Sequence, residues 1–431
     1  MAGEGFRKRK IRTLGKVVTG KTPPTADPEN FGGPYPFITI PDLDGRVFID
    51  STERTISEQG AEILKACKLP AGAVMMSCIA TIGKCGITTR PSFTNQQINS
   101  VICEEYVDPR YLYYCFTRLE YALEAAGGGG SVYTNVSKSR FAEIEIELPS
   151  IFEQRAIACI LGALDDKIEL NRRMNETLEQ IAQAIFKKWF IEPTKNARQK
   201  DGGQGLPEGW RIGYISDLCE VTIGGDWGED EPFDGSIEVI CLRGVDLEYT
   251  RKTGWANAPR RWLKESSLSK RSLDEKDVLV AASGAGPTGR PLWTTNDIQS
   301  AFDLPIVYSN FCKRLRCRSV AYAVYIDRIL YIMRESGEIW EYVTGTSVPN
   351  LDVNSLLRMK EIPIPPANLL ERYLYFYRPI TKRLYSNESR TLAALRDALL
   401  PKLISGELRV PDAEKICARG ASALGGMERC V

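Results

Sequence analysis

The stretch from Pro149 to Phe190 constrains the fold of this chain most strongly, because its apolar residues recur at alternating steps of three and four. This is the a/d pattern of a helix that buries one narrow seam against another helix. The seam positions are Leu161, Leu164, Ile168, Asn171, Asn175, Leu178, Ala182, Ile185 and Trp189. Pro149 and Ser150 favour a helix start, and Pro193 is expected to end the helix. About 38 helical residues would make a rod of roughly 57 Å, so we expect this helix to act as a spacer.

Asn171 and Asn175 interrupt the seam at two positions where apolar residues are expected. They either form a solvated waist in a marginal coiled coil, or they fix the register and the choice of partner at some cost in stability. Both alternatives require a second long helix.

An internal repeat supplies that second helix. The pattern Leu14-x-x-Val17-x-x-Gly20 matches Leu218-x-x-Val221-x-x-Gly224. Further matches follow in the same order: Asp42–Leu43 with Asp246–Leu247, Ala73–Val74 with Leu279–Val280, Ser77 with Ser283, Gly83–Lys84 with Gly289–Arg290, Thr94–Asn95 with Ser309–Asn310, Asn135 with Asn350, and Ile146–Pro149 with Ile362–Pro365. Each copy therefore predicts a globular domain followed by a long helix.

The predicted fold class is α+β: two mixed α/β domains separated by a pair of long antiparallel helices, which form a coiled coil within an internal tandem repeat. The expected boundaries are a first domain at residues 1–148, a long helix at 149–192, a linker at 193–209, a second domain at 210–365, a second long helix at 366–410 and a tail at 411–431. The second helix is expected to break or kink near Pro379, and its seam would contain Leu392, Leu395 and Leu399. Antiparallel pairing would set the two domains at opposite ends of the rod.

The composition excludes several classes of enzyme. The chain has no histidine, which excludes histidine-based acid–base catalysis, Ser-His and Cys-His nucleophiles, and nearly all zinc enzymes. Its 12 cysteines form no CxxC pair, so we expect reduced, mostly buried thiols and no metal site. No stretch approaches the ~20 apolar residues of a membrane span, and the start of the chain lacks a signal peptide, so we expect a cytoplasmic protein that does not enter a membrane. The net charge of +1 neither indicates nor excludes a nucleic acid partner.

Two segments come close to catalytic motifs without matching them. The segment Gly284–Pro291 nearly spells a phosphate loop, but Arg290 and Pro291 stand where lysine and Ser/Thr are required. We interpret it as a tight turn, with a basic side chain aimed at DNA as the alternative. GGPYPF at Gly32–Phe37 lacks the first residue and the proline pair of the adenine-methyltransferase tetrapeptide. The sequence therefore predicts no catalytic residue.

Basic side chains beside turns and tryptophans are the candidates for contact with DNA. Lysine and arginine contacts to phosphates give salt-dependent affinity, whereas Arg, Asn or Gln at base edges gives specificity. For any single candidate, an ordinary solvated charge is the alternative. The candidates are Lys16, Lys21, Lys84, Arg90, Lys138 and Arg140 in the first domain, and Arg251, Lys252, Arg260, Arg261, Arg290 and Arg314 in the second.

Three stretches resemble the specificity (S) subunit of type I restriction-modification systems: LGKVVTGKTP near the start, GKCGITTRPSFTNQQIN at Gly83–Asn99, and the long helix that begins LPSIFEQRAIACILGALDD. The C-terminal LRDALLPKLISGELRV is similar to the closing segment of that family. The resemblance implies a non-catalytic subunit that reads a bipartite, asymmetric site in double-stranded DNA, one half with each domain. It also implies that the helices, through their seam residues and outer faces, dock two methyltransferase (M) subunits, which are joined by restriction/translocase (R) subunits. No cofactor is expected in this chain, since S-adenosylmethionine, ATP and Mg would bind the partner subunits. The alternative is the specificity subunit of a methylation-only complex without a restriction subunit.

Overall fold

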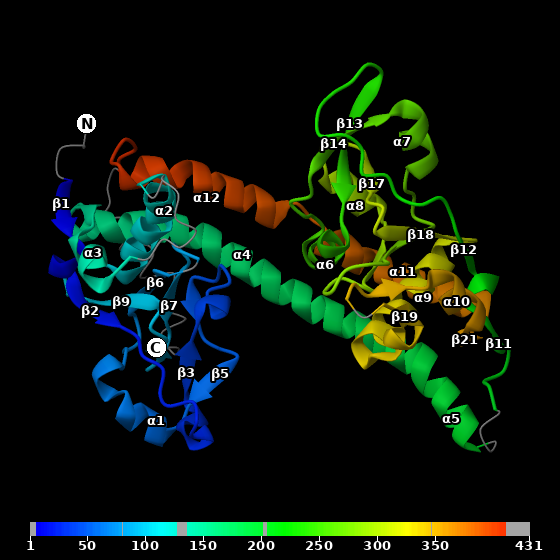
Figure 1. The fold of residues 1–431 in the computed structure, drawn as a ribbon, viewed down its shortest axis with the longest axis horizontal. Helices are drawn as coiled ribbons and strands as arrows, with labels where there is room; N and C mark the ends of the chain where they lie inside the picture. Colours follow the sequence, from blue (N-terminus) through cyan, green and yellow to red (C-terminus); the bar gives the residue numbers. More distant parts are fainter. Residues whose placement is uncertain (1–5, 80, 127–135, 201–204, 346, 411–431) are drawn as a thin grey trace. The chain divides into compact units, whose positions relative to one another are not determined.

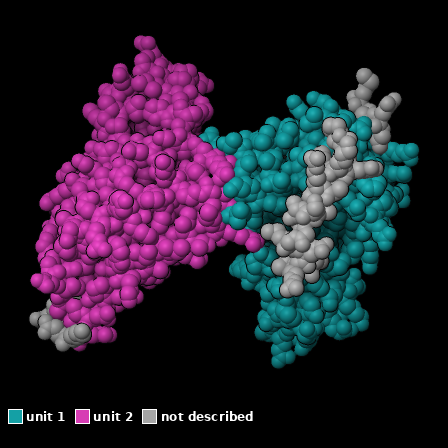
Figure 2. Space-filling model, turned by 180° about the vertical axis from the view of Figure 1, so that it is seen from behind, with its two compact units in different colours: residues 1–170, 389–431 teal, residues 171–388 magenta. Residues whose placement is uncertain are grey.

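The structure is a computed structural model that describes residues 6–79, 81–126, 136–200, 205–345 and 347–410 (Figure 1). The predicted repeat position Asn135 and the predicted tail at 411–431 lie outside these residues. The chain divides into two compact units, residues 1–170 with 389–431 and residues 171–388 (Figure 2). Each unit joins one domain to one half of the long helix α4 (Ile151–Phe186) and to one C-terminal helix.

Unit 1 contains the first domain, which is built on a five-stranded sheet and a three-stranded sheet. In sheet order, the larger sheet is β2 (Gly15–Thr19), β9 (Ile98–Cys103), β6 (Val74–Ser77), β7 (Cys85–Thr88) and β4 (Phe48–Ile49), and the smaller one is β5 (Arg54–Ile56), β3 (Phe31–Ile38) and β8 (Phe93–Thr94). β1 (Arg7–Lys10) pairs with β10 (Glu145–Leu148), which leads into α4. The helices are α1 (Glu58–Ile63), α2 (Pro109–Ala126) and α3 (Lys138–Glu143). β6 and β7 are buried along their whole length, because α2 covers this part of the sheet.

Unit 2 contains the second domain, in which a four-stranded sheet lies beside a three-stranded one. The larger sheet is β12 (Cys219–Val221), β18 (Cys312–Cys317), β15 (Asp277–Ala281) and β16 (Pro291–Trp293), and the smaller one is β14 (Arg260–Lys264), β13 (Ser236–Leu242) and β17 (Ile306–Tyr308). Two pairs complete it, β11 (Arg211–Tyr214) with β21 (Glu361–Ile364) and β19 (Val343–Thr344) with β20 (Asn350–Leu351). The helices are α6 (Gly244–Thr253), α7 (Glu265–Arg271), α8 (Asn296–Ala301), α9 (Val320–Ser336) and α10 (Val353–Met359). α9 packs on the larger sheet, as α2 does in unit 1.

The two domains share one strand topology, which confirms the internal repeat. The order β2-β9-β6-β7 corresponds to β12-β18-β15-β16, and β5-β3-β8 corresponds to β14-β13-β17, including the parallel pair in each small sheet. The structure corrects by two residues the predicted match of the segment that contains Ala73, Val74 and Ser77. Val74 pairs with Val101 and Val278 pairs with the equivalent Leu315, so Ala73–Val74 corresponds to Asp277–Val278 and not to Leu279–Val280. The Gly83 N–H donates to the Ser77 carbonyl and the Gly289 N–H donates to the Ala281 carbonyl, so Ser77 corresponds to Ala281 and not to Ser283. The turn between β15 and β16 is therefore two residues longer than the corresponding turn of the first copy.

A second predicted match is wrong by one residue. The Asn95 N–H donates to the Ile38 carbonyl, and the Ser309 N–H donates to the Leu242 carbonyl. Asn95 therefore corresponds to Ser309. Asn310 corresponds to Gln96. The prediction matched Asn95 with Asn310 because both residues are asparagine.

Helix α4 begins as predicted, but the helical path extends beyond the expected end. The Glu153 N–H donates to the Ser150 hydroxyl at 3.3 Å, which caps the helix. A π-helical turn, η5 (Lys187–Ile191), then leads into α5 (Glu192–Lys200). The prediction that Pro193 ends the helix is wrong. Pro193 lies in the first turn of α5, where the missing N–H costs no helical hydrogen bond, and the preceding π turn changes the hydrogen-bond register.

The second long helix is two helices, α11 (Ala367–Leu384) and α12 (Glu388–Ile404). The break lies at residues 385–387, not at the predicted Pro379, which sits inside α11. Both Pro379 and Tyr375, whose carbonyl loses its helical donor, are exposed, so water can satisfy that carbonyl. Ser386 and Asn387 occupy the break, and both residue types favour helix ends over helix interiors.

Within each unit, α4 runs antiparallel to its C-terminal partner. In unit 1 the ion pairs Asp165–Arg396 (2.6 Å) and Glu153–Arg409 (2.7 Å) join α4 to the C-terminal segment in opposite order. In unit 2 the Tyr373 hydroxyl donates to the Ala182 carbonyl at 3.1 Å. The Asn175 amide reaches the Leu384 carbonyl at 3.4 Å. The predicted antiparallel pairing is therefore confirmed.

The predicted seam is wholly or partly buried at most positions and polar at its middle. Leu161 and Ala182 are fully buried, and the partly buried seam residues are Leu164, Ile168, Asn175, Leu178, Ile185, Trp189, Leu392 and Leu399. Leu395 is 48% exposed and lies on the outer side of α12. Asn171 is buried, where its amide donates to Glu388 at 3.1 Å and accepts from Arg383 at 2.8 Å. This position is thus a closed hydrogen-bonded contact and not a solvated waist.

Candidate nucleic-acid interface

The first-domain candidates lie at the surface, on several different elements. Of these six candidates, Lys84 is half-buried and the others are exposed. The exposed candidates are Lys16 on β2, Lys21, Arg90, and Lys138 and Arg140 on α3. Helix α3 packs against β2, so Lys138 and Arg140 belong to the same part of the domain as Lys16. The prediction missed Arg7, Lys8 and Arg9 on β1, which are exposed as well. The run of four basic residues at Arg7–Lys10 was the signal that could have found them.

Three second-domain candidates are buried, which corrects their predicted role. Arg251 is 6% exposed, and its guanidinium binds the buried Asp327 and the Pro291 carbonyl. Arg261 is 6% exposed and is held by Asp230 and by the carbonyls of Trp227 and Gly228.

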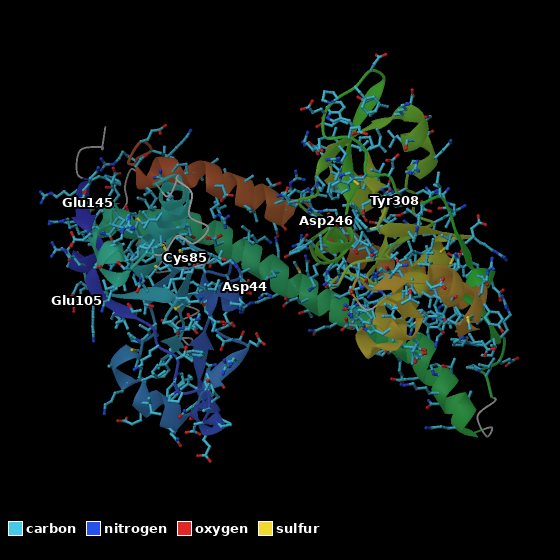
Figure 3. The ribbon with its side chains drawn as sticks, viewed as in Figure 1. Asp44, Cys85, Glu105, Glu145, Asp246 and Tyr308 are labelled. Carbon is cyan, nitrogen blue, oxygen red and sulfur yellow. The ribbon has the colours of Figure 1, made fainter. Side chains whose placement is uncertain are left out.

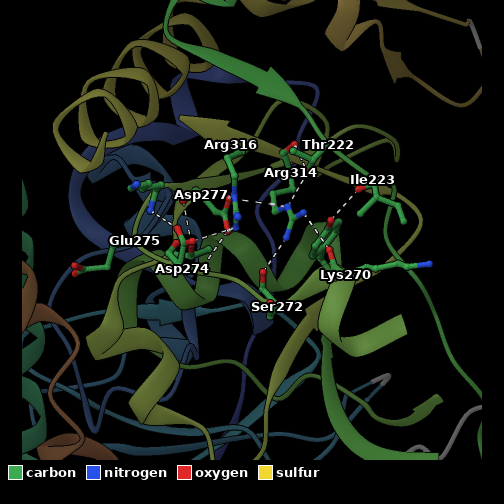
Figure 4. A network of polar contacts seen from close by, with 12 residues as sticks. Thr222, Ile223, Lys270, Ser272, Asp274, Glu275, Asp277, Arg314 and Arg316 are labelled. Carbon is green, nitrogen blue, oxygen red and sulfur yellow. Dashed lines mark hydrogen bonds and ion pairs between the residues drawn. The ribbon is translucent and has the colours of Figure 1, made fainter. Parts of the chain in front are cut away.

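Arg314 is the third buried candidate. It lies in a network in which its guanidinium donates to the Thr222 hydroxyl at 2.6 Å and to the carbonyls of Ser272 and Lys270 (Figure 4). With their donors engaged inside the domain, these three arginines are not available to phosphates.

The remaining second-domain candidates are accessible but have acidic neighbours. Lys252 is 2.9 Å from Glu248, and Arg290 lies 3.9 Å from the same carboxylate. Arg260 is paired with Glu238 and with Asp303 at 2.6 Å. Exposed pairs of this kind are weak, so a phosphate can replace the carboxylate as a partner.

A hollow of about 600 Å³ opens on the second domain, where the β13–α6 junction, the β15–β16 turn and the β17–β18 turn come together. Its walls are mainly apolar, and Phe311 and Val348 are 62% and 60% exposed. The polar side chains of Arg243 and Asn310 also line the hollow. The remaining lining residues are Trp227, Gly244, Val245, Ser283, Gly284 and Pro287. Gly284 and Pro287 come from the segment that resembled a phosphate loop, which the structure forms as a turn.

Arg243 is oriented by a carboxylate. Asp246 accepts from the Arg243 backbone N–H and from its Nε, both at 2.8 Å. The Tyr308 hydroxyl, at the end of β17, donates to the Ile223 carbonyl at 2.8 Å. Figure 3 labels Asp246 and Tyr308 in the second domain. The Asp246 carboxylate raises the pKa of Arg243, against the opposing effect of burial. The guanidinium is therefore a fixed, charged hydrogen-bond donor at the rim of the hollow.

The first domain carries the same backbone scaffold with different side chains. Asp42 occupies the place of Asp246, and it accepts from the Thr39 backbone N–H at 2.8 Å and from the Thr39 hydroxyl at 2.7 Å. Gln96, in the place of Asn310, is exposed, and the Thr22 hydroxyl donates to its amide oxygen at 2.9 Å. One scaffold therefore presents two different chemical surfaces.

Reactive groups are scarce on this scaffold. Among the described residues, no group of three or more Cys, Asp or Glu side chains is arranged to hold a metal ion. Burial raises the pKa of Cys78 to about 11 and those of Cys241 and Cys312 to about 12, so these thiols stay protonated. In the part of the chain that the structure describes, no helix has the length and apolar character needed to cross a membrane.

The chain is similar to known proteins along most of its length. Residues 3–180 match the family described as the type I restriction modification DNA specificity domain. The chain is 30% identical to the type I restriction enzyme MjaIX specificity subunit of Methanocaldococcus jannaschii, over 94% of both chains. It is 35% identical to the HindI specificity subunit of Haemophilus influenzae over 40% of this chain and 39% of that one.

A solved structure has the same fold. The S subunit of a type I restriction-modification system from M. genitalium aligns over 93% of this chain and 96% of its own, with a TM-score of 0.55 and 14% identity. Together with the extended sequence identity to MjaIX, the match over the first domain and α4 settles the family. The chain belongs to the specificity subunits of type I restriction-modification systems, the non-catalytic subunits that recognise a DNA sequence.

Proposed function

We propose that each of the two domains reads one half of a bipartite, asymmetric site in double-stranded DNA. The observation that carries this proposal is that one scaffold occurs twice with different side chains at equivalent surface positions, Thr39 and Arg243, and Gln96 and Asn310. Identical domains would read the same half-site twice, whereas these domains contact different base edges.

The phosphate contacts come from the exposed basic side chains. Candidates are Lys16, Lys21, Lys84, Arg90, Lys138, Arg140, Lys252, Arg260 and Arg290, together with Arg7, Lys8 and Arg9 on β1. They position the domains on the duplex, while Arg243 and Asn310 at the hollow contact bases in the second half-site.

The paired helices dock two methyltransferase subunits, and restriction/translocase subunits complete the assembly. In unit 2 the half-buried Trp189 and Phe376 and the 83% exposed Tyr375 form an aromatic patch around a hollow of about 440 Å³ on the outside of η5 and α11. Such a patch suits a protein partner.

S-adenosylmethionine, ATP and Mg bind the partner subunits and not this chain, and the complex works in the cytoplasm. A methylation-only complex without a restriction subunit is the alternative.

A domain exchange tests the proposal. Residues 11–148 are replaced by the equivalent domain of a relative with a different site, and the complex is reconstituted with its methyltransferase subunits. Methylome sequencing should show that one half-site changes and the other stays. The matched exchange of residues 210–364 should change only the second half-site. A simultaneous change of both half-sites in either chimera would contradict the proposal.

A further inference from the structure

A buried polar triad joins the first domain to the helices of unit 1. The Tyr114 hydroxyl, on α2, donates to the Asp165 carboxylate on α4 at 2.5 Å. The other oxygen of Asp165 is 2.6 Å from Arg396 on α12. Tyr114 and Asp165 are 1% and 7% exposed, so the Asp165 carboxylate is held inside the unit by these two hydrogen-bond partners. We call these residues the first triad.

Unit 2 holds a second triad of Arg328, Glu179 and Tyr377. Arg328 on α9 is 1% exposed and forms a two-pronged ion pair with Glu179 on α4, at 2.5 Å and 3.1 Å. Arg328 also donates to the Tyr377 hydroxyl on α11, and its guanidinium lies 4.4 Å from the centre of the Tyr377 ring. A domain helix, α4 and a C-terminal helix again contribute one residue each.

The two triads occupy equivalent places in the repeat. Tyr114 follows the last residue of β9, Cys103, at the same distance in sequence as Arg328 follows the last residue of β18, Cys317. Asp165 and Glu179 are fourteen residues apart on α4, which is two heptads and keeps both on the same side of the seam.

The triads use the same three chemical groups in a permuted order. Both place a carboxylate on α4. In the first triad the domain supplies the phenol and the C-terminal helix the guanidinium, whereas in the second the domain supplies the guanidinium and the C-terminal helix the phenol.

We propose that the permuted triads fix a single register of α11 and α12 along α4, and so act as positioning residues for the two recognition domains. A shift by two heptads would bring Tyr377 to Asp165, leaving a buried carboxylate between two phenols. A shift of the same size in the opposite direction would bring Arg396 to Glu179, leaving two guanidinium groups on one carboxylate. Both arrangements leave a buried charge uncompensated, which is strongly unfavourable, whereas the observed register pairs every charge. Apolar seam residues alone would not distinguish the two registers, because they repeat every heptad.

A permutation experiment in the full-length chain tests this inference. Tyr114→Arg gives Asp165 two arginines, and Arg396→Tyr gives it two phenols in place of one phenol and one guanidinium. The double variant restores one of each in the order of the second triad. We expect each single variant to lower the melting temperature of unit 1 by roughly 5–15 °C, and the double variant to recover most of that loss. Lys402→Tyr, an exposed basic residue on α12, is the matched control and should change little.

Tyr114→Phe, which removes only one hydroxyl, keeps the test usable if a single charge variant does not fold. It should lower the melting temperature less than Arg396→Tyr does. Additive losses in the double variant would overturn the inference, since they would mean that the three groups do not act as one set.

The register itself is measured by the spacer between the half-sites, a readout that rests on the proposed function. With the methyltransferase subunits added, each single variant should methylate sites with more than one spacer length, and the double variant should return to one. A single, unchanged spacer in all variants would overturn the register assignment. A wild-type complex that methylates no bipartite site would contradict the proposed function instead, while the melting temperatures would still decide whether the triads act as sets.

Discussion

At the scale of single residues, the difficulty lies in telling a DNA-contacting arginine from a structural one. Arg260 and Arg261 are neighbours on β14, yet one is exposed and the other is held inside by Asp230 and two carbonyls. The alternation of a strand predicts that one of the two points inward, but not which one, and the partner Asp230 lies far away in the sequence. Burial of an arginine needs several acceptors, and those are brought together only by the fold.

Arg251 and its neighbour Lys252 give a direct comparison. Arg251→Ala would leave Asp327, which is 1% exposed, without its ion-pair partner, so unfolding should become easier by about 3–5 kcal/mol. Lys252→Ala removes an exposed charge and should change stability by about 0.5 kcal/mol or less. Urea unfolding of both variants measures the difference. Equal stability of the two variants would show that the Arg251–Asp327 pair does not support the domain.

At the scale of elements, the heptad pattern predicted α4, its capped start and its antiparallel partner correctly. It failed at the helix ends because proline was treated as a stop signal. Pro193 lies in the first turn of α5, and Pro379 sits on the exposed side of α11. Whether a proline interrupts a helix depends on its turn position and on access of water to the freed carbonyl, which the pattern does not contain. The triads could not be predicted from the heptad pattern either, because each combines residues from three segments that are distant in the sequence.

Glu179 predicts how unit 2 responds to acid. Burial alone would raise its pKa, but the charge and hydrogen bonds of Arg328 outweigh burial and lower the pKa from 4.5 to about 2. A carboxylate with a lowered pKa in the folded state stabilises the fold above the unfolded value, and this contribution is lost as the pH falls from about 4.5 towards 2. Glu179→Gln should therefore lower stability at pH 7 and make it less dependent on pH below 4.5. Urea midpoints at pH 3 and pH 7, with the exposed Glu176→Gln as control, measure this, and an unchanged pH dependence in Glu179→Gln would contradict the assignment.

At the scale of the whole molecule, the sequence revealed the repeat, but not every residue-by-residue match between its two copies. The strand topology and the backbone hydrogen bonds moved two of the matches, because turns of different length separate the corresponding strands of the two copies. The side chains around the hollow of the second domain were not predicted either. Trp227, Arg243 and Phe311 come from three separate segments, and only the shared scaffold brings them together.

The helical rod predicts the spacing between the half-sites. Four residues inserted in α4 between Asn171 and Asn175, with four more in the α11–α12 break, add about one turn, roughly 6 Å. Since duplex DNA rises ~3.4 Å per base pair, the half-sites should move apart by about one to two base pairs. The bases within each half-site should stay the same, because no surface of either domain is altered. Methylome sequencing would reveal the new spacer, and an active variant with the old spacer would mean that another feature sets the distance.

Because the chain has no histidine, the protonated state of its buried thiols bears on how its charge varies with pH. Histidine is the side chain that normally changes its charge between about pH 5 and 8, and burial holds the pKa values of Cys78, Cys241 and Cys312 well above that interval. Neither histidine nor these three thiols therefore change the charge that this subunit presents to a polyanion over that interval. These groups therefore add no pH dependence to its electrostatic attraction to DNA in that interval, whereas ionic strength screens that attraction.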